Sequence, residues 1–141
     1  MKKHTLVKYG VAVDNPHRYN VIIGTDLGQF SGTVVCREED YENESQYFGF
    51  ELAELKAETE YARAKKRFYG AQQKALQEFW RDMCATRTYD IDAFWVKKMC
   101  ERVDLLDEKR VYWTNREVEL KDLYRTKIVT FDSFNKQRKK R

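Results

Sequence analysis

The chain has 141 residues, a formal net charge of +4, and contents of 35% charged and 14% aromatic residues. That length suits one domain with a modest core, and the aromatic content excludes a disordered chain. The three cysteines are widely spaced and form no C-x-x-C pair, which argues against a disulfide framework or a zinc site. No signal-peptide pattern or membrane-spanning apolar run is recognised, so we expect a protein of the cytoplasm.

Residues 5–37 have the pattern of three β-strands. The runs TLVKYGVAV, YNVII and FSGTVVCR are rich in β-branched and aromatic residues. They are separated by DNPHR and GTDLGQ, whose Gly, Asn, Asp and Pro residues are typical of turns. The sequence therefore predicts an antiparallel meander, and such a sheet needs a cover on one face.

The cover is predicted to be a long helix from about Ser45 to Cys84. An apolar stripe recurs along it at spacings of three and four residues, which is typical of an amphipathic helix. Alanines alternate with aromatics on this stripe, so we expect a close approach to another element at the alanines. Added apolar residues in the second half predict that this end is buried on two sides. The stripe comprises Phe50, Ala53, Ala57, Tyr61, Ala64, Phe68, Ala71, Ala75 and Phe79.

A break at TRTYDID, where Thr88 or Asp90 could cap a new helix, leads to a second helical pattern that ends near residue 127. Thr114 and Glu117 have the spacing of a capping box, which favours two segments over one. The run KIVTF at 127–131 could form a strand that returns to the sheet. The segment from Trp113 to Tyr124 would serve either as internal core or as a homodimer contact.

The predicted fold class is α+β, with a three-stranded antiparallel β-sheet at the N-terminus packed on a long helix. One or two further helices and a basic tail follow. Within a single domain, 1–141, the parts are a β-meander at 1–37, an acidic connector with the long helix at 38–84, a C-terminal helical part at 88–127 and the tail at 132–141.

Negative charge is concentrated in residues 38–60, which hold nine acids and one base, a net charge of −8. Carboxylates near a helix start interact favourably with its dipole, and this structural explanation is one alternative for the block. The other is a surface that binds arginines and lysines meant for nucleic-acid phosphate. We call this candidate the acidic face, and it comprises Glu38, Glu39, Asp40, Tyr41, Glu42, Glu44, Glu51, Glu54 and Glu58.

Positive charge forms a stripe on the opposite side of the long helix. Such a stripe could follow a phosphate backbone, and the basic tail would add salt-dependent affinity. Alternatively it is a solvated face, partly neutralised by Glu60 and Glu78 through pairs three or four residues apart. The basic stripe comprises Lys56, Arg63, Arg67, Lys74 and Arg81, and the basic tail comprises Lys136, Arg138, Lys139, Lys140 and Arg141.

No catalytic or cofactor motif is recognised. The phosphate-binding, dinucleotide-binding, nucleophile-elbow and zinc-protease patterns are all absent from the sequence. The two histidines, His4 and His17, fall in the sheet region, and His17 lies in a polar turn. We therefore expect no enzyme, no catalytic residue, no cofactor and no metal.

The stretch from Gly32 to Arg63 resembles small accessory proteins of bacteriophages and prophages. In these, a strand ending in Gly-x-Ala-x-Cys leads through an acidic Asp-x-aromatic connector to a Gly and a Leu-Ala at a charged helix. The alanine of that pattern is Val34 here, and the aromatic directly follows the Asp. The resemblance implies a phage-type protein, and some such proteins inhibit CRISPR effectors by stoichiometric binding. The matching residues are Gly32, Cys36, Asp40, Tyr41, Gly49, Leu52 and Ala53.

These observations lead to two functional hypotheses. The first is a non-enzymatic, anti-CRISPR-like inhibitor that docks its acidic face on a host protein or nucleoprotein effector, such as a CRISPR nuclease. The second is an accessory protein that binds DNA or RNA directly through the basic stripe and the basic tail. Neither hypothesis involves a membrane.

Overall fold

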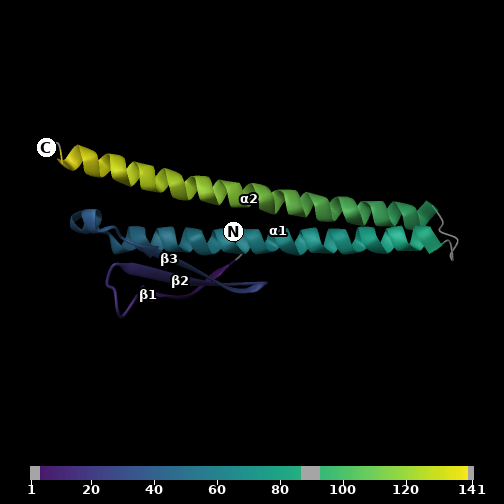
Figure 1. Cartoon of the computed structure of the whole chain (residues 1–141), viewed down its shortest axis with the longest axis horizontal. Helices are drawn as coiled ribbons and strands as arrows, with labels where there is room; N and C mark the ends of the chain where they lie inside the picture. Colours follow the sequence, from purple (N-terminus) through teal and green to yellow (C-terminus); the bar gives the residue numbers. More distant parts are fainter. Residues whose placement is uncertain (1–3, 87–92, 140–141) are drawn as a thin grey trace. The chain divides into compact units, whose positions relative to one another are not determined.

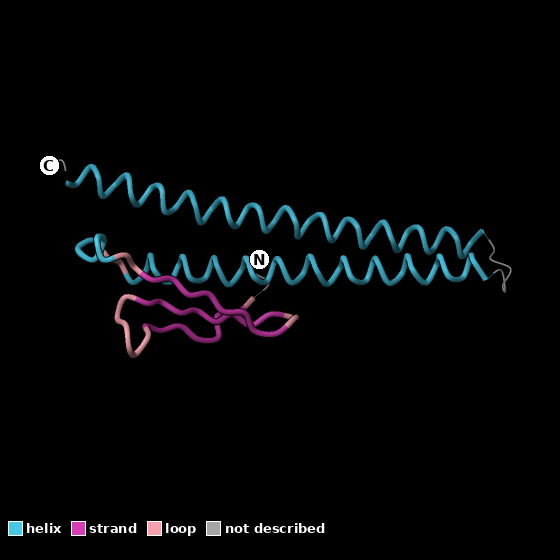
Figure 2. The backbone as a smooth tube through the Cα atoms, viewed as in Figure 1, coloured by secondary structure: helices cyan, strands magenta, loops and turns pink. Residues whose placement is uncertain are grey.

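The computed structural model describes residues 4–86 and 93–139, and its elements are three strands, one short 3₁₀ helix and two long helices (Figures 1 and 2). In the described residues no helix is both long and apolar enough to cross a membrane. The elements are β1 (Thr5–Val11), β2 (Arg18–Thr25), β3 (Gly28–Val35), η1 (Glu38–Asn43), α1 (Gln46–Thr86) and α2 (Ala93–Lys139). The predicted α+β class, with its N-terminal meander and long helix, is confirmed.

The sheet is antiparallel, with strand order β1-β2-β3. Thr25 pairs with Gly28 across a two-residue turn, and Gly28 has a φ of 114°, a left-handed conformation that favours glycine. The Thr25 hydroxyl donates to the Gly28 carbonyl at 2.7 Å and so fixes this turn. The predicted turn chemistry thus sets the register of the second hairpin.

Helix α1 begins where the sequence predicts. The Ser45 hydroxyl accepts a hydrogen bond from the Phe48 amide at 3.3 Å, as expected of an N-cap residue. The first turn of α1 contains no acidic residue. The dipole explanation for the acidic block therefore fails for the helix itself, because its acids lie before the cap or beyond the first turn.

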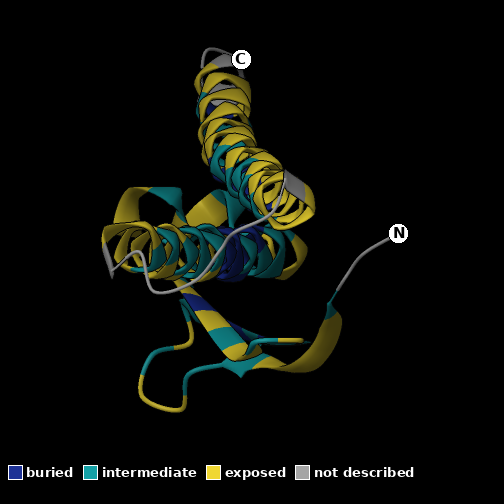
Figure 3. Cartoon of the chain, turned by 90° about the vertical axis from the view of Figure 1, so that its right-hand side faces the viewer, coloured by how far each residue is buried: buried dark blue, intermediate teal, exposed yellow. Residues whose placement is uncertain are grey.

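The described residues belong to two compact units, and both long helices pass from one to the other. Unit 1 covers 1–62 and 116–141, and unit 2 covers 63–115. Within unit 1, the first part of α1 contacts the sheet on one side and the end of α2 on another (Figure 1). Buried positions, dark blue in Figure 3, gather on α1 and in the sheet.

Gly32 marks the closest approach of the sheet to α1. A Cβ added there would lie 2.0 Å from the Ala53 carbonyl oxygen and 2.7 Å from the Ala57 nitrogen. Tyr19, Val21 and Ile23 of β2 are buried beside this contact. The close approach predicted at the alanines of the stripe is therefore confirmed in unit 1.

The described residues of unit 2 form a pair of helical segments with a small core. Leu106, Trp113 and Lys65 are buried there, and the Lys65 ammonium lies 5.8 Å from the centre of the Trp113 ring. Gln73 of α1 donates to Asp107 of α2 at 3.3 Å. Two hydrogen bonds lower the pKa of the Asp107 carboxyl, and the bond from Arg110 has a larger effect than the bond from Gln73.

The prediction that the far end of α1 is buried on two sides is wrong. Phe68 is 41% exposed and Phe79 is 57% exposed, and Ala71 and Ala75 are exposed as well. The three strands belong to unit 1 and cover only its part of α1. The two-sided burial therefore occurs in the first part of the helix.

The predicted break near Thr114 is also wrong, because α2 is one helix of 47 residues. The Thr114 hydroxyl donates to the Arg110 carbonyl at 2.8 Å, the usual bond of a threonine inside a helix. Glu117 accepts from Lys121 at 3.0 Å instead of reaching back to a cap. Capping-box spacing occurs here without a helix start.

The run at 127–131 is helical, so the predicted returning strand is wrong. Lys127 forms an ion pair with Glu51, and Phe131 stacks on Phe48 with ring centres 4.7 Å apart. These contacts place the run against α1, where a helix satisfies its own backbone groups. Residues 132–139 continue the same helix and so replace most of the predicted tail with regular structure.

Some predictions fall outside the described residues. The break at 87–92, with the candidate caps Thr88 and Asp90, is one of them, and the tail residues Lys140 and Arg141 are another. The segment from Trp113 to Tyr124 lies within α2, with Trp113 buried in unit 2 and Leu120 buried in unit 1. Both residues therefore serve as internal core.

Candidate partner-binding surface

The exposed part of the acidic face is the short helix η1. Glu38, Glu39 and Glu42 are exposed on it, and Tyr41 is 39% exposed between them in sequence. No residue of η1 is buried. We call this group the acidic knob, defined as Glu38, Glu39, Tyr41 and Glu42.

Tyr41 is held in place from behind by His17. The two rings stack with centres 3.6 Å apart and planes 10° apart. The His17 Nδ1 atom in turn lies 2.7 Å from a carboxylate oxygen of Glu44. The turn before β2 therefore orders the aromatic residue of the acidic knob, which lowers the entropy cost of binding with it.

Glu44 joins the connector to the sheet through both of its carboxylate oxygens. One oxygen faces His17, and the other accepts a hydrogen bond from the Tyr19 hydroxyl at 2.5 Å. Burial raises the pKa of the Tyr19 hydroxyl, and the hydrogen bond to Glu44 raises it further. Glu44 thus acts inside the fold and is not a free docking carboxylate.

Arg37 fixes the start of η1. Its guanidinium bonds Asp40 at 3.0 Å and Asp132 of α2 at 2.8 Å, and Glu39 lies 3.4 Å away. The negative charges of Asp40 and Asp132 raise the pKa of the Arg37 guanidinium, and Asp40 has the larger effect. Asp40 and Glu39 are therefore both paired with Arg37, but the Asp40 side chain is 13% exposed whereas that of Glu39 is 66% exposed.

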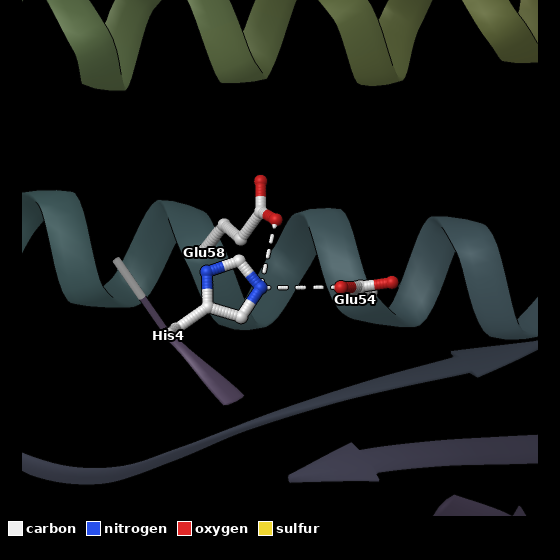
Figure 4. Close-up of side chains that lie close together, drawn as sticks. All are labelled: His4, Glu54 and Glu58. Atoms are coloured by element: carbon white, nitrogen blue, oxygen red, sulfur yellow. Dashed lines mark hydrogen bonds and ion pairs between the residues drawn. The ribbon is translucent and has the colours of Figure 1, made fainter. Parts of the chain in front are cut away.

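The helical members of the acidic face also have partners inside unit 1. Glu51 is paired with Lys127, whereas Glu54 and Glu58 both lie 3.2 Å from the Nε2 atom of His4 (Figure 4). The structure therefore divides the nine candidate residues into the exposed acidic knob, of which Glu39 also pairs with Arg37, and five half-buried carboxylates with internal partners. One continuous acidic surface is not formed.

A pocket of about 300 Å³ lies in unit 1 between the end of the sheet, the start of α1 and the end of α2. Its lining includes the apolar side chains of Val34, Leu52 and Ile128, with Arg37 and Asp40 also present. Asp40 belongs to η1, so the pocket adjoins the acidic knob. The pocket is therefore an apolar recess next to charged residues, and many protein interfaces likewise have an apolar core with a polar rim.

The basic stripe is divided between the two units. In unit 1, Lys56 donates to the Thr33 carbonyl at 3.3 Å, and its ammonium lies 5.5 Å from the centre of the Tyr124 ring. In unit 2, Arg67, Lys74 and Arg81 are exposed, and none of these three forms an ion pair in the described part of the chain. Arg63 is half-buried and makes other contacts.

The neutralisation expected from Glu78 is not formed. Glu78 is exposed and makes no ion pair with Lys74 or Arg81 in the described structure. Of the basic tail, Lys136 is exposed on α2, and the backbone of Arg138 and Lys139 is helical. Three cations thus remain available on α1 of unit 2.

Sequence reasoning missed the polar group that His4 forms with Glu54 and Glu58 in unit 1. His4 stands alone in the sequence, 50 residues before Glu54, and no local motif connects them. The only available signal was the spacing of Glu54 and Glu58, which places both carboxylates on one side of α1. The long-range pairing of His17 with Glu44 was missed for the same reason.

No family model, no curated protein and no solved structure matches the chain.

Proposed function

We propose that the chain is a non-enzymatic binding protein that inhibits a nucleic-acid-handling effector of a bacterial host by stoichiometric docking, as anti-CRISPR proteins of phages do. The acidic knob carries this proposal. It presents three exposed carboxylates around a tyrosine that His17 holds in place. Surfaces that bind nucleic acid expose arginine and lysine, and carboxylates form strong charge-assisted hydrogen bonds with both.

The proposed contact has a centre and a rim. Tyrosine is a frequent hot-spot residue, and Tyr41 is ordered before binding. The neighbouring pocket of about 300 Å³ would receive an apolar side chain of the partner. The effector's basic groups would then meet Glu38, Glu39 and Glu42 in the bacterial cytoplasm.

Charge reversal tests this surface. The variant Glu38→Lys, Glu39→Lys, Glu42→Lys should weaken inhibition of nuclease cleavage by at least about 100-fold, because attraction becomes like-charge repulsion. Glu78→Lys, Asp104→Lys, Glu108→Lys makes the same change in net charge at exposed acids elsewhere and should inhibit normally. The assay is target-DNA cleavage by a panel of purified CRISPR effectors, titrated with the chain.

A pull-down from bacterial lysate, with and without nuclease treatment, identifies the effector for this assay. A partner that survives nuclease and is lost with the acidic-knob variant supports docking on protein. Equal capture by both triple variants would exclude the acidic knob as the site.

The second candidate function is direct binding of DNA or RNA through α1 of unit 2. The specific observation in its favour is that Arg67, Lys74 and Arg81 are exposed and form no ion pair in the described structure. Residues 67 to 81 span about 21 Å along one helix at 1.5 Å per residue. That length suits contact with several phosphates of one backbone.

Fluorescence anisotropy with labelled DNA and RNA tests this candidate. Binding should fall steeply as salt rises, and Arg67→Gln, Lys74→Gln, Arg81→Gln should reduce both the affinity and the salt slope. Lys97→Gln, Arg102→Gln, Arg125→Gln removes as many exposed charges from α2 and should bind nearly as the unmodified chain does. No binding at low salt would exclude this function.

A further inference from the structure

Three potential metal ligands from two separate segments meet at one point in unit 1. His4 lies directly before β1, and Glu54 and Glu58 lie one turn apart on α1 (Figure 4). A carboxylate oxygen of each glutamate is 3.2 Å from His4 Nε2, and the three ligand atoms all lie within 4.8 Å of one another. These contacts join the residue before β1 to helix α1.

The distances suit a shared ion better than two separate hydrogen bonds. An imidazole Nε2 carries at most one hydrogen, so it can point that hydrogen well at only one carboxylate. Both carboxylates are nevertheless at the same distance from this nitrogen, 3.2 Å. For zinc bonds of about 2.0–2.2 Å, neighbouring ligand atoms of a tetrahedron lie about 3.4 Å apart, close to these values.

The group is also sheltered from water. The side chain of His4 is 8% exposed, that of Glu58 14% and that of Glu54 26%. An ion bound there would keep its protein ligands largely desolvated, which strengthens its attraction to the carboxylates. Surface acids that attract counterions loosely lack this burial and the imidazole.

We propose that His4, Glu54 and Glu58 form a binding site for a divalent transition-metal ion, with Zn²⁺ as the preferred ion. Imidazole nitrogen favours Zn²⁺ over Mg²⁺ and Ca²⁺, and carboxylate oxygens are accepted by all three. Three protein ligands leave a fourth position for water. The ion links the segment before β1 to α1, so it stabilises unit 1 and is independent of docking by the acidic knob.

Calorimetric titration of the full chain with Zn²⁺ tests the proposal. One equivalent should bind, and the thermal unfolding temperature should rise with Zn²⁺ because only the folded state holds the site. His4→Ala and the isosteric Glu58→Gln should each weaken Zn²⁺ binding by at least about tenfold. Even the loss of a residue that only hydrogen-bonds to a metal ligand costs about that much, and these two variants remove a ligand itself. The control His17→Ala, which removes the other histidine–carboxylate pair, should bind Zn²⁺ as before.

Co²⁺ absorption identifies the ligands independently, because thiolate ligands give a strong sulfur-to-cobalt charge-transfer band. A Co²⁺ spectrum without that band excludes Cys36, Cys84 and Cys100 as ligands. Loss of this Co²⁺ spectrum in His4→Ala supports the site. The proposal is overturned if Zn²⁺ affinity is unchanged in both His4→Ala and Glu58→Gln while circular dichroism shows both variants folded. Binding of Mg²⁺ or Ca²⁺ in preference to Zn²⁺ would overturn it as well.

Discussion

Tyr19 joins the sheet, the connector and the long helix through a single side chain. It is 2% exposed, its ring packs on Gly49 of α1, and its hydroxyl donates to Glu44 at 2.5 Å. A Cβ at Gly49 would lie 2.5 Å from this ring, so the glycine is needed for the contact. The Tyr19–Glu44 bond therefore holds the connector on which the acidic knob stands.

Tyr19→Phe should lower the free energy of unfolding by about 1.5–3 kcal/mol, because a half-buried hydrogen bond to a charged acceptor is lost. Urea unfolding followed by circular dichroism measures the change. Tyr112→Phe is the matched control, since Tyr112 is 55% exposed and its hydroxyl makes no hydrogen bond in the described structure. Equal stability of the two variants would show that the Tyr19 hydroxyl contributes nothing.

Cys36 should be the slowest of the three thiols to alkylate. Burial raises the pKa of the Cys36 thiol, and the Glu44 and Asp40 carboxylates raise it further against the opposing Arg37. Only the thiolate reacts, and Cys84 and Cys100 are exposed. Peptide mapping after timed iodoacetamide treatment at mildly alkaline pH measures the order, and fastest labelling of Cys36 would contradict it.

The residue scale also shows what a sequence cannot supply. Negative charge at 38–60 is visible in the sequence, but the partner of each carboxylate is set by tertiary contacts. His4 meets Glu54 across 50 positions, and Lys127 meets Glu51 across 76. Such pairs depend on how the elements pack, so the sequence predicted one acidic face where the structure has an acidic knob and internal pairs.

At the level of elements, the contact of β3 with α1 depends on one glycine. Gly32→Ala should cost at least about 3 kcal/mol of unfolding free energy, because its Cβ would overlap the backbone of α1 at Ala53. Backbone atoms cannot move aside as a side chain can, so the whole sheet would have to shift. Thermal and urea unfolding measure the loss.

Gly10→Ala provides the control for this substitution. Gly10 lies in β1, and nothing is within 4 Å of a Cβ built there. Gly10→Ala should therefore change the free energy of unfolding by less than about 1 kcal/mol. A small increase is expected, because alanine lowers the chain entropy of the unfolded state. A Gly32→Ala protein as stable as Gly10→Ala would contradict the packing of β3 on α1.

The elements were predictable where local chemistry decides them. The strands follow from β-branched runs between turn residues, and α1 follows from its apolar period and the Ser45 cap. Helix α2 was divided incorrectly because Thr114 and Glu117 match a capping box yet bond inside a continuous helix. The β-branched run at 127–131 was misassigned because its packing on α1 outweighs its strand propensity.

For the whole molecule, the two units differ in how much core they contain. Unit 1 buries Tyr19, Val21 and Ile23 of the sheet together with several residues of α1. The described residues of unit 2 form paired helical segments without a sheet, and they expose large apolar side chains such as Phe94 and Trp95. Helices of this kind depend on tertiary packing for their stability, so the units should not be equally stable.

Hydrogen exchange along α1 tests this difference within one helix. Amides at 55–61, in unit 1, should show protection at least about tenfold higher than amides at 74–81, in unit 2, because opening the latter exposes less buried apolar surface. Mass spectrometry of exchanged, proteolysed protein resolves the two segments. Uniform protection along α1 would contradict the prediction. If sedimentation of such a protein showed a dimer, the physical reason would be a second copy of the chain that covers the apolar side chains of unit 2.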